Sequence, residues 1–213
     1  MTSPACRALA EENAAGLIID SNHVYRLNDK IIPSVTQIIN AVIPRKYQPD
    51  PWYLERGSAL HAAINCYARG EVDRTLNHDY EGKLSAFHKF IAETKAEIVE
   101  SEVMLSSLGR SFAGTYDAVL QIGEARHRGV RILCDWKSSV LPTADLQLGA
   151  YSLLLFANGK PPCAKAVAVH LKDNGNFSCR WVDLKNAEKA FLSVLNVYNW
   201  MEKNKMLIEQ KEN

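Results

Sequence analysis

Apolar residues follow two different spacings along this chain, and the spacings divide it into helices and strands. Where apolar side chains recur every three or four residues, we expect helices over 4–16, 35–42, 52–68, 81–95, 143–158 and 184–206. Where they recur at every second residue, we expect strands over 98–105, 112–122, 130–137, 164–171 and 177–182. Residues 17–28 alternate about Ser21 and Asn22, which is typical of a hairpin. The pattern predicts an α/β fold with a central mixed β-sheet flanked by helices.

The size and composition of the chain are those of an ordinary globular domain. It has 213 residues, of which 47% are hydrophobic and 23% are charged. We expect one domain over 1–213, with an N-terminal helix and hairpin extension at 1–31, a core at 32–183, and a C-terminal helix and tail at 184–213. No apolar run approaches the roughly 20 residues of a membrane span, so no membrane partner is expected. The net charge of +1 neither requires nor excludes a polyanionic partner.

The cysteines and the N-terminus bear on the compartment. Five scattered cysteines form no zinc-type pairs, which favours a reducing environment. Glu11 and Glu12 interrupt the basic-then-apolar order of a secretory signal. We therefore expect a cytoplasmic protein.

The chemistry of the chain concentrates on two of the predicted strands. In 130–137, the apolar even positions leave Asp135 and Lys137 together on the other face, and Asp117 lies opposite the apolar even positions of 112–122. The loop between the strands is centred on Arg126, so a symmetric hairpin pairs residue 117 with residue 135. Two facing carboxylates repel each other unless a cation binds between them. The alternative is a pair of solvated aspartates on an exposed hairpin.

Several other residues are candidates whose role the pattern alone does not decide. His61 on the helix 52–68 is a metal ligand or an ordinary surface or core histidine. Gln147 and Tyr151 share one helical face, where they line a site or simply pack. Glu102 is a further acidic ligand or a solvated strand residue. The candidate DNA contacts are Arg56, Arg126, Arg128 and Tyr151.

Four separated motifs, in order, resemble those of RecB-type nucleases of the PD-(D/E)xK superfamily. They are 57–61 (GSALH), 114–117 (GTYD), 135–139 (DWKSS) and 147–151 (QLGAY). The earlier stretch 33–39 (PSVTQII) is similar to one shared by phage exonucleases and the mitochondrial genome maintenance exonuclease. The resemblance covers about residues 32–156 and implies a PD-(D/E)xK nuclease fold with an αβββαβ core. Some relatives carry a four-cysteine iron–sulfur cluster, for which Cys163 and Cys179 do not supply the pattern, so none is expected.

The resemblance also implies a site and an activity. Mg²⁺, or Mn²⁺ in its place, would be held by Asp117, Asp135, the backbone carbonyl of Trp136 and the imidazole of His61, with Glu102 as an extra acidic member. Lys137 would activate the attacking water. Gln147 and Tyr151 would line the site and help hold the DNA strand.

The expected activity is metal-dependent hydrolysis of DNA by an exonuclease in recombination or repair. The segment 70–97 would form a small helical arch over the cleft and favour a single strand with a free end. A phage origin and a single-strand annealing protein as partner fit this setting. The alternatives are a site-specific or structure-specific endonuclease of the same fold, and a DNA-binding module without catalysis.

Overall fold

The computed structural model describes residues 16–20, 24–44, 50–71, 80–122, 129–139 and 142–207. Its centre is a five-stranded sheet in the order β4-β5-β6-β7-β8. The strands are β4 (Glu97–Ser107), β5 (Phe112–Ile122), β6 (Val130–Lys137), β7 (Lys165–Leu171) and β8 (Phe177–Val182). Strands β6 and β7 are parallel, and the other neighbouring pairs are antiparallel. The predicted mixed sheet is confirmed.

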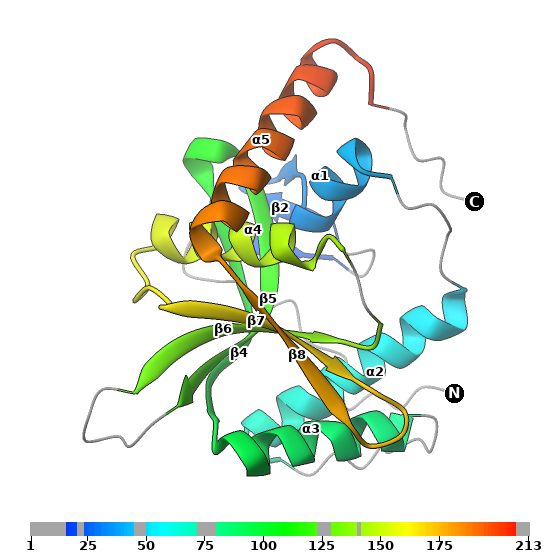
Figure 1. Ribbon diagram of the computed structural model, residues 1–213. Helices are drawn as coiled ribbons and strands as arrows, with labels where there is room; N and C mark the ends of the chain where they lie inside the picture. The colour runs from blue at the N-terminus through cyan, green and yellow to red at the C-terminus, as the bar shows by residue number, and fades with distance from the viewer. Residues whose placement is uncertain are drawn as a thin grey trace.

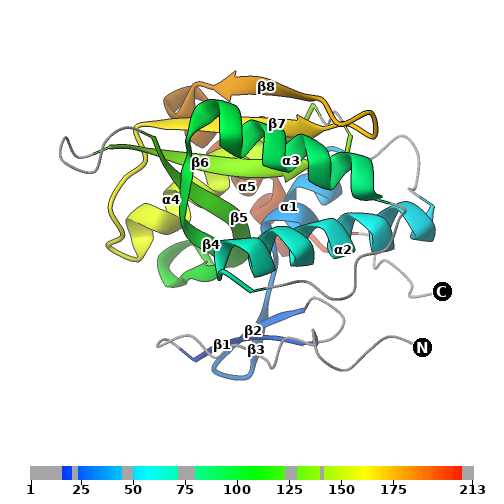
Figure 2. The same ribbon diagram turned by 90° about the horizontal axis from the view of Figure 1, so that it is seen from below.

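Helices cover both faces of this sheet (Figure 1). On one side lie α1 (Val35–Val42), α4 (Ala144–Ala157) and α5 (Leu184–Lys203), and on the other lie α2 (Pro51–Ala68) and α3 (Glu81–Thr94). Figure 2 shows α2 and α3 running across the sheet face. A hydrophobic core fills each interface. The order from α3 through β4, β5, β6 and α4 to β7 is the expected αβββαβ core, in which α4 makes the crossover that a parallel strand pair requires.

Because helices cover both faces of the sheet, one expectation about the strands is wrong. We expected the even positions of 112–122 to share one apolar face. Instead, Phe112 and Tyr116 pack in the core under α4 and α5, whereas Ala118 and Leu120 pack in the core over α2 and α3. The strand thus exchanges its faces around residue 117, which a sequence pattern cannot reveal when both faces are buried and apolar.

A small second sheet precedes α1. It consists of β1 (Leu17–Ile19), β2 (Tyr25–Leu27) and β3 (Lys30–Ile32), all antiparallel. The predicted hairpin is present, but β3 was missed. Asn28 and Asp29 join β2 to β3 with φ of 48° and 63°, the left-handed geometry of a two-residue hairpin turn. The turn residues 21–23 and the expected helix 4–16 lie outside the described residues.

Local signals in the sequence place α1 against the central sheet. The Ser34 hydroxyl accepts a hydrogen bond from the Gln37 backbone, and the Gln37 side chain accepts one from the Ser34 backbone. This capping box begins the helix as predicted. The Ala113 backbone N–H donates to the Pro33 carbonyl, which ties the start of α1 to β5.

The described part of the segment 70–97 does not form an arch. It contains α3, whose Phe87 and Phe90 are buried against the indole of Trp136. The expected arch is therefore wrong for residues 80–97, because the apolar stripe of this helix covers the sheet. Residues 72–79 lie outside the description. Within the described segments, no helix has the length and hydropathy needed to cross a bilayer.

Candidate active site

The candidate site lies where β5 separates from β6. Pairing between these strands runs from Ile122–Val130 to Ala118–Cys134 and is centred on residue 126, as predicted. One step beyond the last pair, the Asp117 carboxylate accepts a hydrogen bond from the Trp136 backbone N–H at 2.7 Å. A side chain therefore satisfies a backbone donor at the point where the ladder ends.

Both predicted carboxylates are buried at this fork, by which we mean the point where β5 and β6 separate beyond the Ala118–Cys134 pair. Asp117 is 8% exposed and Asp135 is 1% exposed. The alternative of two solvated aspartates is therefore wrong. Buried carboxylates are costly unless they are paired with cations or bind a metal ion, so their partners decide what this site can do.

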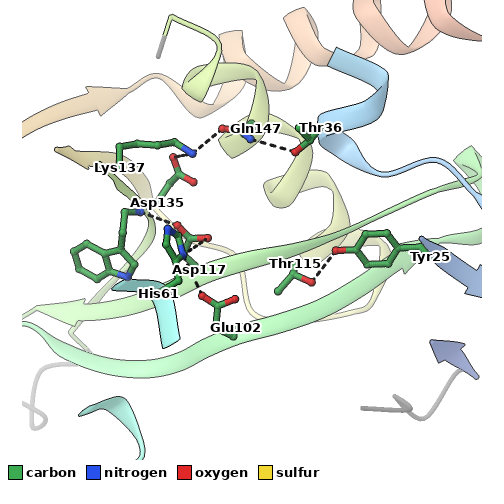
Figure 3. A network of polar contacts seen from close by, with 10 residues as sticks. Tyr25, Thr36, His61, Glu102, Thr115, Asp117, Asp135, Lys137 and Gln147 are labelled. Atoms are coloured by element: carbon green, nitrogen blue, oxygen red, sulfur yellow. Dashed lines mark hydrogen bonds and ion pairs between the residues drawn. The ribbon is translucent and has the colours of Figure 1, made fainter. Parts of the chain in front are cut away.

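Glu102 and His61 lie beside Asp117 at the fork (Figure 3). Nδ1 of His61, on α2, lies 3.3 Å from Oε1 of Glu102 and 3.5 Å from Oδ1 of Asp117. Glu102 lies inside β4 with φ of 49°, a strained conformation for a residue other than glycine. Its neighbour Glu100 reaches a different set of partners on β5 and β6. Glu102 thus lies in the cluster beside His61 and Asp117, and its role as a metal ligand stays a prediction.

The charges in the cluster perturb one another. Burial alone would lower the pKa of His61, but the carboxylates of Asp117 and Glu102 outweigh burial and raise that pKa to about 9. Burial raises the pKa of Asp135 to about 7, against the lowering effect of the Lys137 ammonium. Burial likewise raises the pKa of Asp117, opposed by His61. Burial is thus the main cause of both raised carboxyl pKa values, and repulsion from a neighbouring carboxylate adds to it.

Lys137 is held in a fixed position on the other side of the fork. Its Nζ lies 2.8 Å from Oδ2 of Asp135 and donates to Oε1 of Gln147, also at 2.8 Å. The amide nitrogen of Gln147 lies 3.4 Å from the Thr36 hydroxyl. The chain from Thr36 through Gln147 thus orients the amide oxygen toward the lysine. The sequence predicted Gln147 as a site residue. Thr36 lies in the similar stretch 33–39 but was not predicted as a site residue.

The side chains of Tyr151 and Trp136, also predicted at the site, are packed in the hydrophobic cores. Tyr151 is 6% exposed, and burial raises its pKa far above the usual range. Its ring packs beside Gly114, where a Cβ would lie 2.9 Å from the ring. The side chain of Trp136 is buried in the core over α2 and α3. Tyr151 and Trp136 thus pack into the cores on opposite faces of the sheet. The backbone carbonyl of Trp136 stays the predicted ligand.

Of the predicted DNA contacts, the described residues include Arg56 and Tyr151. Arg56 forms an ion pair with Asp173, and its guanidinium lies 5.1 Å from the centroid of the Trp52 ring. Asp173, in the turn between β7 and β8, also binds the buried Lys83 at 3.0 Å. Arg126 and Arg128 lie outside the described residues. The Lys83–Asp173–Arg56 cluster was not foreseen, because its members are far apart in the sequence.

A second unpredicted contact supports the fork from the N-terminal sheet. The Tyr25 hydroxyl and the Thr115 hydroxyl are 2.9 Å apart. Thr115 lies on β5, two residues before Asp117. Tyr25 is buried, and burial raises its pKa. The small sheet therefore fixes β5 close to the carboxylates (Figure 3).

The donor set fits a hard divalent cation. One nitrogen of His61 and one carboxylate oxygen each of Glu102 and Asp117 lie within 4.8 Å of one another. Asp135 adds a third carboxylate beside them, and its carboxyl pKa is raised partly by the charge of Asp117. Oxygen-rich sets with one imidazole suit Mg²⁺ or Mn²⁺. A bound cation would take over the charge compensation that protonated His61 now supplies.

Of the comparisons with known proteins, the one with solved structures bears on the fold. Neither a protein-family model nor a curated protein sequence matches the chain. Among solved structures, a protein from Eubacterium rectale assigned as an exonuclease is similar over 83% of both chains, at 9% identity and a TM-score of 0.51. The alignment with an alkaline exonuclease from Laribacter hongkongensis covers 81% of this chain and 92% of that protein, at 13% identity and a TM-score of 0.31. The chain thus shares the mixed α/β fold of the Eubacterium rectale protein.

Proposed function

We propose that this protein is a metal-dependent deoxyribonuclease of the PD-(D/E)xK type that hydrolyses phosphodiester bonds, and that it acts as an exonuclease. The observation that carries the proposal is the fork at which the buried carboxylates of Asp117 and Asp135 lie beside Lys137. Glu102 and His61 extend the acidic side, and the exonuclease folds among the structural neighbours add support.

Each side chain has a role that follows from its position. Asp117, Asp135, Glu102 and His61 would hold the cation, which polarises the scissile phosphate and lowers the pKa of a bound water. Lys137 would donate to the attacking water or to the phosphate oxygens as negative charge develops. Because its ammonium is already held by Asp135 and Gln147, little reorganisation is needed on binding. Water attacks phosphorus in line, without a covalent enzyme intermediate.

The test is hydrolysis of end-labelled single-stranded and double-stranded DNA with Mg²⁺, Mn²⁺ or EDTA. We expect shortening from an end with either metal, no product in EDTA, and no cleavage of covalently closed circular DNA. Nicking of the circle would instead favour an endonuclease.

The matched variant is Asp135→Asn, which keeps the shape of the side chain and removes its charge. We expect at least about a 10²-fold loss of rate, the scale of removing one group that stabilises the transition state. Undiminished cleavage by this variant, or equal cleavage in EDTA, contradicts the proposal.

A further inference from the structure

A cavity of about 220 Å³ adjoins the candidate active site on the α4 side of the sheet. Lys137 belongs to both: its ammonium bonds to Asp135 and Gln147, and its side chain forms part of the cavity wall. The cavity extends from Lys137 across the sheet to β8, the edge strand. The cavity is therefore next to the proposed metal site, with Lys137 between the two.

The lining of this cavity combines an apolar floor with a polar and basic rim. Ala144 and Ala168 are buried in the core and form the floor. The rim carries the side chains of Ser139, His170, Ser178 and Arg180. Apolar walls with a few convergent polar groups are characteristic of ligand sites.

The electrostatic surroundings of the rim favour an anion. Burial lowers the pKa of His170, and the ammonium groups of Lys172 and Lys83 lower it further, so the imidazole offers a neutral hydrogen-bond donor rather than a charge. Arg180 adds a guanidinium, which is suited to phosphate oxygens. The lining thus includes two positively charged side chains, Lys137 and Arg180, around a space large enough for a ligand.

We propose that this cavity binds the nucleotide next to the scissile phosphodiester, with the phosphate of that nucleotide against Arg180 and His170. The inference rests on the proposed function, because Lys137 at the scissile phosphate fixes where the strand enters. Consecutive phosphates are joined by one sugar, so the neighbouring nucleotide must lie beside Lys137. The cavity provides space for it there.

One carboxylate competes with the phosphate for this site. Oδ1 of Asp145, in the first turn of α4, lies 2.6 Å from a guanidinium nitrogen of Arg180, and both side chains are about half exposed. An incoming phosphate has to replace this ion pair. Removing the Asp145 charge should therefore strengthen binding, whereas removing Arg180 should weaken it.

The experiment measures binding of a fluorescent single-stranded oligothymidylate to the full chain in EDTA, over a series of salt concentrations. Arg180→Ala should weaken binding about threefold to tenfold and reduce the slope of log K against log salt by about 0.7, the value for one phosphate contact on a single strand. His170→Ala should weaken binding as well. Lys189→Ala is the charge-matched control, because Lys189 is exposed on α5, and it should change neither quantity.

Two further variants separate the cavity from general surface charge. Asp145→Asn should tighten binding at least about threefold, whereas the exposed control Glu202→Gln on α5 should not. Ser178→Phe, at an exposed position of β8, fills the cavity without removing a charge. It should weaken binding about fivefold, or about 1 kcal/mol, and leave the salt slope unchanged.

The binding results separate failure of this inference from failure of the proposed function. If the wild type cleaves no nucleic acid with Mn²⁺ but the variants bind as expected, the nuclease proposal fails and the nucleotide site stands. If the wild type cleaves DNA but the Arg180, Asp145 and Ser178 variants bind like their controls, the cavity proposal is overturned.

Discussion

Replacing Glu100 by glutamine removes one charge from a network that holds three elements together. The carboxylate accepts hydrogen bonds from Tyr116 on β5, from Arg131 on β6 at 2.6 Å, and from Lys160 after α4 at 2.7 Å. Burial alone would raise the carboxyl pKa, but the hydrogen bonds of the three partners outweigh it and lower the pKa of Glu100 to about 2. Glutamine keeps the shape of the side chain and loses this charge.

The size of the effect follows from that pKa. A shift from 4.5 in the unfolded chain to about 2 in the folded protein corresponds to about 3 kcal/mol. Because the Glu100 side chain is still 18% exposed, solvent screening reduces this figure to about 2 kcal/mol. The folded pKa is the lower one, so this stability is complete above pH 4.5 and is lost as the pH falls toward 2.

The assay is urea denaturation of wild type and Glu100→Gln at pH 7 and at pH 3. We expect the free energy of unfolding of the variant to be about 2 kcal/mol lower at pH 7, and the difference to shrink at pH 3. The matched control is Glu97→Gln at an exposed position of the same strand, which should stay within about 0.5 kcal/mol of wild type. If Glu100→Gln is as stable as that control at pH 7, or if the difference is the same at both pH values, the reasoning is refuted.

The remaining stability predictions concern close packing and the fork. Gly149→Ala should destabilise the fold by about 1–3 kcal/mol in chemical denaturation, because the new Cβ would lie 2.4 Å from the Ala187 carbonyl on α5. The control Gly57→Ala meets nothing within 4 Å on α2 and should not be destabilising. Asp117→Asn should melt above wild type in EDTA, since it removes a buried charge whose carboxyl pKa is raised. Added Mn²⁺ should raise the melting temperature of wild type and not of Asp117→Asn; equal shifts would contradict a metal site at Asp117.

The strands that carry the site could be predicted closely from the sequence. The observed bounds of β5 and β6 equal the predicted ranges 112–122 and 130–137. Their register followed from the symmetry of a short loop, and it brought Asp117 to the level of Asp135. Strand alternation also placed Asp135 and Lys137 on one face, where their side chains form an ion pair. These features depend on local geometry, which a single sequence expresses well.

Features that depend on tertiary context could not be predicted in this way. Glu102 joined the cluster through a positive φ inside β4, which no residue pattern signals for a glutamate. The contact of Gln147 with Thr36 joins α4 to α1, more than a hundred residues away. The cavity beside Lys137 depends on how α4 begins relative to β7 and β8. The short strand β3 was missed because its turn contains Asn28 and Asp29 rather than the more familiar Asn-Gly.

The most direct test of the account is single-turnover cleavage of end-labelled DNA by Lys137→Met with Mn²⁺, beside the control Lys89→Met on the exposed side of α3. Methionine keeps the length of the lysine and removes its charge. We expect Lys137→Met to bind DNA but to cleave at least about 10²-fold more slowly, a loss of about 2.7 kcal/mol in transition-state stabilisation. The control should cleave like wild type. Cleavage by Lys137→Met at the wild-type rate would contradict the assignment of this fork as a nuclease active site.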